Sequence, residues 1–322
     1  MLYPIFDLHC DLLSYLEDDS ERTAYDLDAL CSIPQLMQGH VRYQILAAFT
    51  RTGLDSVKKG MAQIGIFEQL PLLYPEHFIH FDKNMRNASH TSNVAIALAC
   101  ENASTFCSED ESLELGLNRL QGIIDTIYKP LYISLTWNME NRFGGGALTN
   151  IGLKEDGKRL LDFLHDKNIA IDFSHASDAL AYDLFTYMDK HHLNLTVMAS
   201  HSNARVITQA LRNLPDDIAK EIFRRKGVIG MNFYRPFVGE TSDVFMKHLS
   251  HWIDLGGSSH ICFGADFFYE QDKKTDNFFP DYDNASCYPK FLSACIAALH
   301  LDEQTIENLC YRNFMTFLEA HA

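Results

Sequence analysis

Short runs rich in β-branched and aromatic residues recur eight times along the chain, and segments with helical spacing of apolar residues lie between them. The strand-like runs span residues 3–9, 43–49, 94–100, 131–136, 169–174, 195–200, 228–233 and 260–265. Helical spacing occurs at residues 57–73, 155–165, 179–188, 217–225 and 244–255, and a terminal helix is expected at residues 302–320. No low-complexity linker or internal repeat interrupts the series.

Strands that alternate with helices are expected to pair in parallel, because a helix supplies the crossover between parallel neighbours. Eight such units in 322 residues predict an α/β protein, a (β/α)8 TIM barrel that forms a single domain over residues 1–322. The alternative is a doubly wound open sheet, but no GxGxxG or GxxxxGK[ST] loop follows any run. The triplet Gly144-Gly145-Gly146 is interpreted as a flexible loop near a site or as a plain turn.

Polar side chains follow the strand-like runs, at the end where a barrel carries its catalytic residues. Because side chains alternate along a strand, Asp7, His9 and Asp11 are expected to share one face of the first run. Later runs are followed by carboxylate and imidazole groups, which include Glu101, Asp172, His175, His201 and Asp266.

Carboxylates gathered at one mouth are costly to bury unless cations neutralise them. Imidazole and carboxylate ligands suit Zn²⁺ or a similar divalent ion, and two ions bridged by one carboxylate would use these ligands well. Only three of the 15 histidines belong to this cluster. The other twelve are expected at the surface of helices or loops, and they include His191, His192, His248 and His251.

Composition limits the partners of such a site. Lys and Arg number 27 against 43 Asp and Glu, and the formal net charge of −16 argues against nucleic acid and against an anionic membrane surface. No signal peptide is recognised, and no apolar run reaches the roughly 18 residues of a membrane span. The eight cysteines form no CxxC pair, which predicts reduced structural thiols. A soluble cytoplasmic protein is expected.

The motifs, in chain order, resemble those of the membrane (renal-type) dipeptidase family, the binuclear zinc dipeptidases of the amidohydrolase-like barrels. They run from residue 6 to residue 267, and YRNFMTFLE resembles the terminal helix of that family. The matching stretches are FDLHCDLL, ACENAS, GLKEDG, IDFSHAS, ASHSNAR, LRNLPDD, GMNFY and FGADF. The resemblance implies a dipeptide-like substrate and suggests a homodimer.

The resemblance also implies roles for single residues. His9 and Asp11 would hold one zinc ion, and Glu101 would bridge it to a second ion. His175 and His201 would hold that second ion. A bridging water, its pKa lowered by both cations, would attack the peptide carbonyl, and Glu101 would take up its proton.

Further roles concern the substrate. Asp266 would assist proton transfer to the departing amine, and Arg212 would pair with the terminal carboxylate through two hydrogen bonds. Tyr234 would either line the pocket or pack at the rim of the barrel. Asp7 would orient one of the ligands.

One position departs from the family pattern. Many members carry a histidine after the fourth strand that is thought to stabilise the developing oxyanion, whereas Trp137 stands there in this chain. An indole N–H donates one hydrogen bond but has no tunable proton, and Asn138 is a candidate substitute.

Two other functions stay open at this point. Trp137 and the loop at residues 141–150 favour hydrolysis of another amide, a lactone or a phosphoester, because loops set specificity on a shared barrel. A metal-binding barrel without turnover is the third hypothesis.

Overall fold

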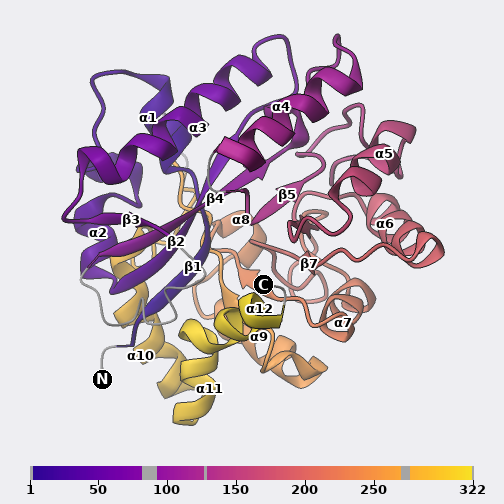
Figure 1. Cartoon of the computed structure of the whole chain (residues 1–322). Coiled ribbons are helices and arrows are strands. Elements are labelled where there is room, and N and C mark those ends of the chain that lie inside the picture. The colour runs from indigo at the N-terminus through magenta and orange to yellow at the C-terminus, as the bar shows by residue number, and fades with distance from the viewer. Residues whose placement is uncertain (1–2, 82–92, 127–128, 270–275, 321–322) are drawn as a thin grey trace.

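The computed structural model of the chain describes residues 3–81, 93–126, 129–269 and 276–320. Figure 1 shows strands in the interior and helices around them. The strands are β1 Ile5–Cys10, β2 Val41–Phe49, β3 Phe78–His80, β4 Val94–Glu101, β5 Tyr132–Ser134, β6 Ala170–Asp172, β7 Val197–Met198, β8 Ile229–Met231 and β9 Ile261–Phe263. The first helices are α1 Leu12–Asp18, α2 Ile33–Gln38, α3 Ser56–Leu73, α4 Leu113–Thr126, α5 Glu155–Leu164 and α6 Asp178–His191. The later helices are α7 Asp216–Arg224, α8 Arg235–Val238, α9 Val244–Trp252, α10 Tyr288–Leu299, α11 Glu303–Glu307 and α12 Asn313–Ala320.

The strands form a closed parallel barrel. Their order is β7-β6-β5-β4-β2-β1-β9-β8, and a parallel bridge between Ala199 and Ile229 joins the two ends of this path. The backbone bond from Gly230 N–H to Ala199 O, 2.8 Å long, lies at the same seam. The expected (β/α)8 barrel is therefore confirmed, and a doubly wound open sheet is excluded. All eight expected strands are present, and β3 is an additional short strand that pairs with β4.

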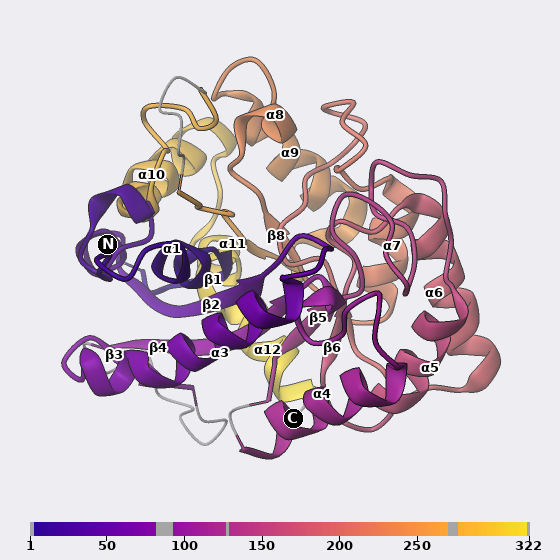
Figure 2. The same cartoon turned by 90° about the horizontal axis from the view of Figure 1, so that it is seen from above.

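Helices cover the outside of the barrel (Figure 2). Residues on the outward faces of the strands pack against them, as Phe173 does against Phe185 of α6, with ring centroids 4.5 Å apart. The inward faces form a separate apolar cluster that includes Leu8, Ile45 and Ala97. Burial of these two layers supplies the main driving force for closure of the barrel.

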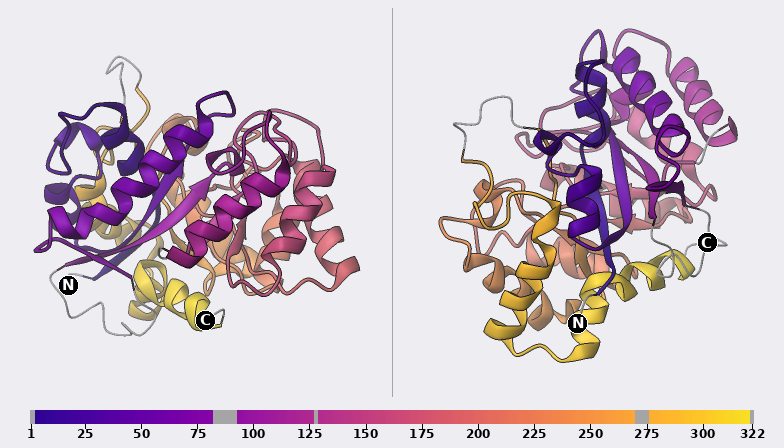
Figure 3. Two further views of the ribbon diagram at one scale, coloured as in Figure 1. Left: turned by 45° about the horizontal axis from the view of Figure 1, so that its top comes forward. Right: turned by 90° about the vertical axis from the view of Figure 1, so that its left-hand side faces the viewer.

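Helix α12, at the yellow end of the chain in Figure 3, lies at the end of the barrel where the strands begin. Phe314 of α12 packs against Tyr43 near the start of β2, with ring centroids 5.1 Å apart. The side-chain amide of Asn313 donates to Ile261 O at the start of β9. The expected terminal helix is present as α11, a π-helical turn at Asn308–Arg312 and α12, which follow one another directly. α12 thus covers the bottom of the barrel and leaves the other end for a site.

The cysteines and the lengths of the helices agree with the sequence analysis. All eight cysteines are buried and unpaired, as expected of structural thiols. None of the helices in the described ranges has both the length and the apolar character that crossing a bilayer requires.

A glycine at the barrel seam gives a test of closure. A Cβ on Gly230 would lie 2.0 Å from Ser200 O, which is backbone and has no room to move. We expect Gly230→Ala to lower the free energy of unfolding by about 1–3 kcal/mol, measured by chemical denaturation. Gly65, in α3, has no atom within 4 Å of such a Cβ, so Gly65→Ala should raise that free energy by about 0.5–1 kcal/mol. Equal effects of the two substitutions would contradict the prediction.

Candidate active site

The carboxyl ends of several strands bring the expected ligand residues into one buried group. His9 is near the end of β1, Glu101 ends β4, and Asp266 follows β9. His175 and His201 follow β6 and β7. All five are buried, with exposed fractions between 0% and 9%. Parallel pairing explains the meeting, because all strands of the barrel end on the same side.

Glu101 lies between two sets of potential ligands. Its Oε2 is 3.2 Å from His9 Nε2, whereas its Oε1 is 2.7 Å from His175 Nε2 and 3.8 Å from His201 Nε2. The ligand atoms of His9, Asp11 and Glu101 lie within 4.8 Å of one another, and so do those of Glu101, His175 and His201. The two oxygens of one carboxylate thus face two different metal-binding groups.

Orphaned buried atoms indicate that these groups fit cations. Among the described residues, His9 Nε2 and Asp11 Oδ1 are buried and have no hydrogen-bond partner. Leaving such atoms unsatisfied costs free energy, and a divalent ion at this place would satisfy both. The donor set of imidazole nitrogens and carboxylate oxygens is one that Zn²⁺ accepts.

Hydrogen bonds behind His9 fix which of its nitrogens is free. Its Nδ1 lies 2.6 Å from Tyr132 Oη, and the Tyr132 hydroxyl donates its only proton to Leu8 O, 3.1 Å away. His9 Nδ1 must therefore carry the proton that joins it to Tyr132, and the lone pair of Nε2 faces Glu101.

Asp172 fixes the tautomer of His201 through the hydroxyl of Ser200. The Ser200 hydroxyl donates to Asp172 Oδ2, 2.8 Å away, so it accepts from His201 Nδ1, 2.7 Å away. Asp172 is fully engaged, because it also accepts from the Ser134 hydroxyl and from the N–H groups of Ser174 and Ser200. Sequence reasoning assigned no role to Asp172, although its position two residues before Ser174 at the end of a strand was a usable signal.

His175 has two competing neighbours at Nδ1. Asn138 Oδ1 lies 2.9 Å away and Arg212 Nε lies 3.0 Å away. The bond to Asn138 Oδ1 requires a proton on Nδ1, and the bond from Arg212 requires a bare nitrogen, so the two cannot form together. If Nε2 serves as a metal ligand, Nδ1 keeps the proton, and Arg212 Nε is then released for another acceptor.

Arg212 is a buried cation without a carboxylate partner among the described residues. Its guanidinium donates to Ser202 Oγ and to His201 O, at 3.2 and 3.3 Å, and it lies 5.6 Å from the Phe237 ring centre. Burial lowers the pKa of Arg212, and the acidic groups around it oppose that shift. A buried guanidinium in this state is suited to an incoming anion.

The carboxyl groups of the site hold protons more tightly than usual. Burial raises the pKa of Glu101 to about 8 and that of Asp266 to about 7. Asp266 Oδ2 accepts a 2.9 Å hydrogen bond from Asn232, and its Oδ1 faces His9 Nε2 at 3.6 Å. Burial also lowers the pKa of His175 and that of His201, so both imidazoles are neutral at neutral pH and available as ligands.

Left-handed backbone conformations aim several of these side chains. Asn102, His175 and Asp266 have φ angles of 75°, 69° and 64°. Residues other than glycine rarely adopt such angles, because the Cβ is crowded there. The surrounding hydrogen bonds must therefore maintain this strain at the site.

The expectation that Asp7 shares a face with His9 and Asp11 is wrong. The pairing of β1 with β2 shifts register between Asp7 and Cys10, so one extra residue interrupts the alternation. Asp7 accepts from the Tyr288 hydroxyl of α10 and from the N–H groups of Ala265 and His9. It therefore supports the backbone of His9 and does not point with the ligands.

His248 also departs from expectation, because it is fully buried and not at the surface. Its Nδ1 accepts from Ala204 N–H, and its Nε2 donates to Val238 O. Burial lowers its pKa to about 4. His191 and His192 are exposed as expected, whereas His90 and His321 lie outside the described residues.

The glycine triplet forms a closely packed loop beneath His175. Ser177 N–H donates to Gly145 O, and Ala147 N–H donates to His175 O. A Cβ on Gly146 would lie 1.8 Å from Trp137 O. The glycines are buried and allow backbone to approach backbone, so the interpretation as a loop near a site is the better of the two.

The remaining expected residues lie around the mouth. Trp137 is partly buried, with its ring 5.9 Å from that of His175. Tyr234 packs against Phe237, with centroids 4.8 Å apart, and against Phe268.

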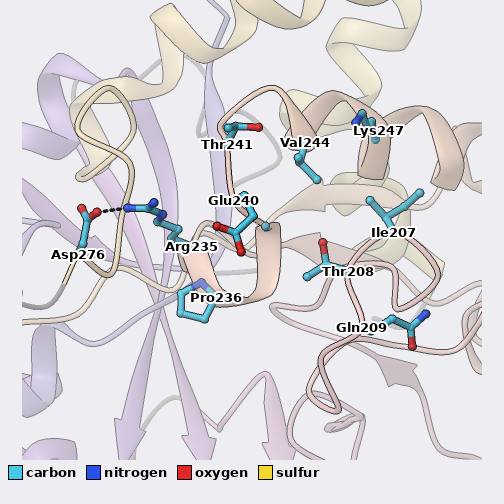
Figure 4. Close-up of a pocket in the computed structure, with 11 residues that line it drawn as sticks. Ile207, Thr208, Gln209, Arg235, Pro236, Glu240, Thr241, Val244, Lys247 and Asp276 are labelled. Carbon is cyan, nitrogen blue, oxygen red and sulfur yellow. Dashed lines mark hydrogen bonds and ion pairs between the residues drawn. The ribbon is translucent and has the colours of Figure 1, made fainter.

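A separate hollow of about 790 Å³ lies beside α8 and α9. Its lining includes Lys247 and the ion pair of Arg235 with Asp276 (Figure 4). None of the candidate ligands lines this hollow.

Comparison with known proteins places the chain in a family. The family model of membrane dipeptidases, peptidase family M19, matches residues 2–321. The chain belongs to the membrane dipeptidase family. The resemblance drawn from the motifs is therefore confirmed, as is the expected class of enzyme, a metal-dependent dipeptidase among the hydrolases.

Individual relatives agree with this placement. An uncharacterised dipeptidase of Schizosaccharomyces pombe is 25% identical over 303 residues, which cover 82% of this chain and 69% of that protein. A metallopeptidase of Rhodobacter sphaeroides, bound to a phosphinate mimic of L-Ala-D-Ala, has a TM-score of 0.86 at 20% identity, with both chains covered in full. A probable dipeptidase of Pseudomonas aeruginosa has a TM-score of 0.77 at 15% identity and covers 100% of this chain and 96% of its own. These two structures show that the fold is shared.

The raised carboxyl pKa values predict a pH-dependent loss of stability without metal. Glu101 and Asp266 rise from 4.5 and 3.8 to about 8 and about 7, so the folded metal-free protein keeps protons that the unfolded chain releases. This contribution to stability is complete below about pH 4 and is lost as the pH rises through 7 to 8. Bound cations replace the protons, so the difference in Tm between zinc-loaded and chelator-treated protein should grow between about pH 5 and about pH 8. A constant difference in a scanning fluorimetry series would contradict this.

The hydrogen bond behind His9 gives a second test. Tyr132→Phe removes the group that holds His9 Nδ1, and zinc affinity should fall about 10- to 100-fold in a competition assay with a chelating dye. Tyr43→Phe is the matched control, because Tyr43 is equally buried in the barrel and its hydroxyl has no hydrogen-bond partner among the described residues. Equal zinc affinities of the two variants would refute the role of Tyr132.

Proposed function

We propose that this member of the family is a binuclear zinc-dependent dipeptidase that hydrolyses the peptide bond of dipeptides with a metal-bridging hydroxide. The observation that carries the proposal is the position of Glu101, whose Oε2 faces His9 and whose Oε1 faces His175 and His201, within a cluster where His9, His201 and Asp266 form a further candidate group. His9 and Asp11 form one group, and His175 and His201 form the other. Two zinc ions bound there supply a nucleophile at neutral pH and polarise the scissile carbonyl.

The protein positions the ligands before any ion binds. Tyr132 fixes the tautomer of His9, and Ser200 with Asp172 fixes that of His201. The imidazoles of His175 and His201 need lose no proton, because burial lowers their pKa, whereas Glu101 gives one up on binding because its pKa is about 8. Affinity for the ions is therefore expected to rise with pH in this range.

Arg212 is proposed to hold the terminal carboxylate of the substrate. Its guanidinium is buried, lacks an acidic partner among the described residues, and already lies 3.0 Å from the ligand His175. A carboxylate bound by two hydrogen bonds would place the adjacent peptide bond near Glu101. This anchor favours dipeptides, because a longer chain would put its terminal carboxylate farther from the bond to be cleaved.

Asp266 is proposed to carry the proton that the departing amine needs. Its carboxylate lies beside the candidate ligand His9, where it can carry a proton to the amine. Oδ2 is occupied by the amide of Asn232, so Oδ1, which faces His9, is the oxygen available for the proton.

Asn138 and Trp137 are proposed to replace the usual family histidine. Asn138 uses its oxygen on His175 Nδ1, which leaves its amide N–H groups for the substrate oxygen. The Trp137 indole beside His175 offers one more donor. Tyr234, at the start of α8, is proposed to line the same pocket. A cytoplasmic location and a homodimer stay predictions.

The function is tested by release of amino acids from a dipeptide panel. Zinc-loaded protein should hydrolyse dipeptides, and Glu101→Gln should lower kcat/KM at least about 100-fold, because an amide cannot bridge two cations as a carboxylate does. Glu114→Gln is the matched control, since Glu114, on α4, forms an exposed ion pair with Arg159 and belongs to none of the candidate metal-binding groups.

Two results would contradict the proposal. One is full activity of Glu101→Gln at normal metal content, and the other is hydrolysis of lactones or phosphoesters with no cleavage of any dipeptide. The metal content of each variant, measured per chain by elemental analysis, separates a lost catalytic role from lost metal.

A further inference from the structure

The arginines of this acidic chain are nearly all paired with carboxylates. Of the twelve arginines within the described ranges, nine form ion pairs, and the three exceptions are Arg42, Arg51 and Arg212. Arg42 lies at the start of β2, where its guanidinium donates to Val41 O. Arg51 and Arg212 both lie at the mouth of the barrel. The site therefore contains two cations without acidic partners in the described part of the chain, and the proposed function uses only one of them.

The backbone around Arg51 is fixed beside a metal ligand. Asn102, which directly follows Glu101, donates from Nδ2 to Thr50 O at 2.8 Å and to Thr52 Oγ1 at 3.1 Å. These two acceptors flank Arg51 in the sequence. The position of Arg51 is thus coupled to that of Glu101 by the side chain between their two strands.

Trp137 extends this position toward the ligands. The Arg51 guanidinium carbon lies 5.4 Å from the Trp137 ring centre, and the Trp137 ring lies 5.9 Å from that of His175. Phe49, the last residue of β2, packs against the Trp137 indole, with ring centroids 5.2 Å apart. A guanidinium that stacks on an aromatic face keeps its N–H groups at the edge free to bind a carboxylate. Arg51 itself is exposed at the rim.

His175 lies between the side chains of Arg51 and Arg212. Arg51 follows β2 and Arg212 follows β7, but both guanidinium groups reach toward His175: Arg51 stacks on Trp137, whose ring is 5.9 Å from that of His175, and Arg212 Nε lies 3.0 Å from His175 Nδ1. A dipeptide whose terminal carboxylate binds Arg212 would therefore pass His175 and bring its N-terminal residue toward Trp137 and Arg51.

We propose that Arg51 and Trp137 form a subsite for an acidic side chain on the N-terminal residue, so that preferred substrates are dipeptides that begin with Glu or Asp. The proposal rests on the proposed dipeptidase function. A substrate with two carboxylates at opposite ends matches two guanidinium groups that have no acidic partner among the described residues, one on each side of His175. A basic side chain would be repelled by Arg51, and a neutral amide would lose the charge-assisted hydrogen bonds.

The test compares isosteric substrates that differ only in charge. Zinc-loaded protein is assayed on Glu-Ala against Gln-Ala and on Asp-Ala against Asn-Ala, each with L- and D-alanine. The ratio of kcat/KM for acid over amide should be about two- to fivefold, since an exposed ion pair contributes at most about 1 kcal/mol. The ratio should shrink as salt is added. In Arg51→Gln it should fall to about one, and in Arg51→Lys it should be partly retained.

Arg42→Gln is the matched control. Arg42 is also an arginine without an ion pair among the described residues, but it lies at the start of β2, at the end of the barrel away from the candidate site. Its replacement should leave the ratio unchanged. Efficient hydrolysis with a ratio near one in the wild type, or a ratio that survives in Arg51→Gln, overturns the acidic subsite and leaves the dipeptidase function standing. Absence of hydrolysis across the whole panel, with two zinc ions bound per chain, overturns the dipeptidase function itself.

Discussion

The carboxylate of Glu101 lies buried among three imidazoles, and much of the barrel mouth is organised around its charge. Burial lowers the pKa of His175 and that of His201, so these rings bring no positive charge to offset it. Without cations, Glu101 keeps its proton up to about pH 8. A buried anion flanked by neutral nitrogen ligands is stable only with metal ions or protons, and the orphaned atoms of His9 and Asp11 complete the case for metal.

The fold was largely predictable because each strand is marked by a short stretch of the sequence itself. Each buried parallel strand appears as a short apolar run, and the candidate ligands follow those runs directly. The short strand β3, Phe78–His80, is too brief to separate from its surroundings. The π-helical turn at Asn308–Arg312 within the terminal helix is likewise not visible in the spacing of apolar residues.

What could not be predicted depends on contacts between distant segments. The direction of Asp7 follows from a register shift between β1 and β2, and the burial of His248 follows from bonds to Ala204 and Val238. The support of His201 by Asp172 joins β6 to the end of β7. The types of the candidate ligands could be predicted from the sequence motifs. The hydrogen bonds that select the histidine tautomers could not, because they join residues that meet only in the closed barrel.

Asn102 holds the segment of Arg51 with its amide nitrogen, and its amide oxygen accepts from Asn141 in the loop that carries Trp137. One side chain thus ties two rim segments to the strand that ends in Glu101. Arg51 is free to change without loss of the candidate ligands, because its guanidinium stacks on Trp137 and contacts none of them. Asn102 has no such freedom, since its replacement would disturb substrate choice and hydrolysis at once.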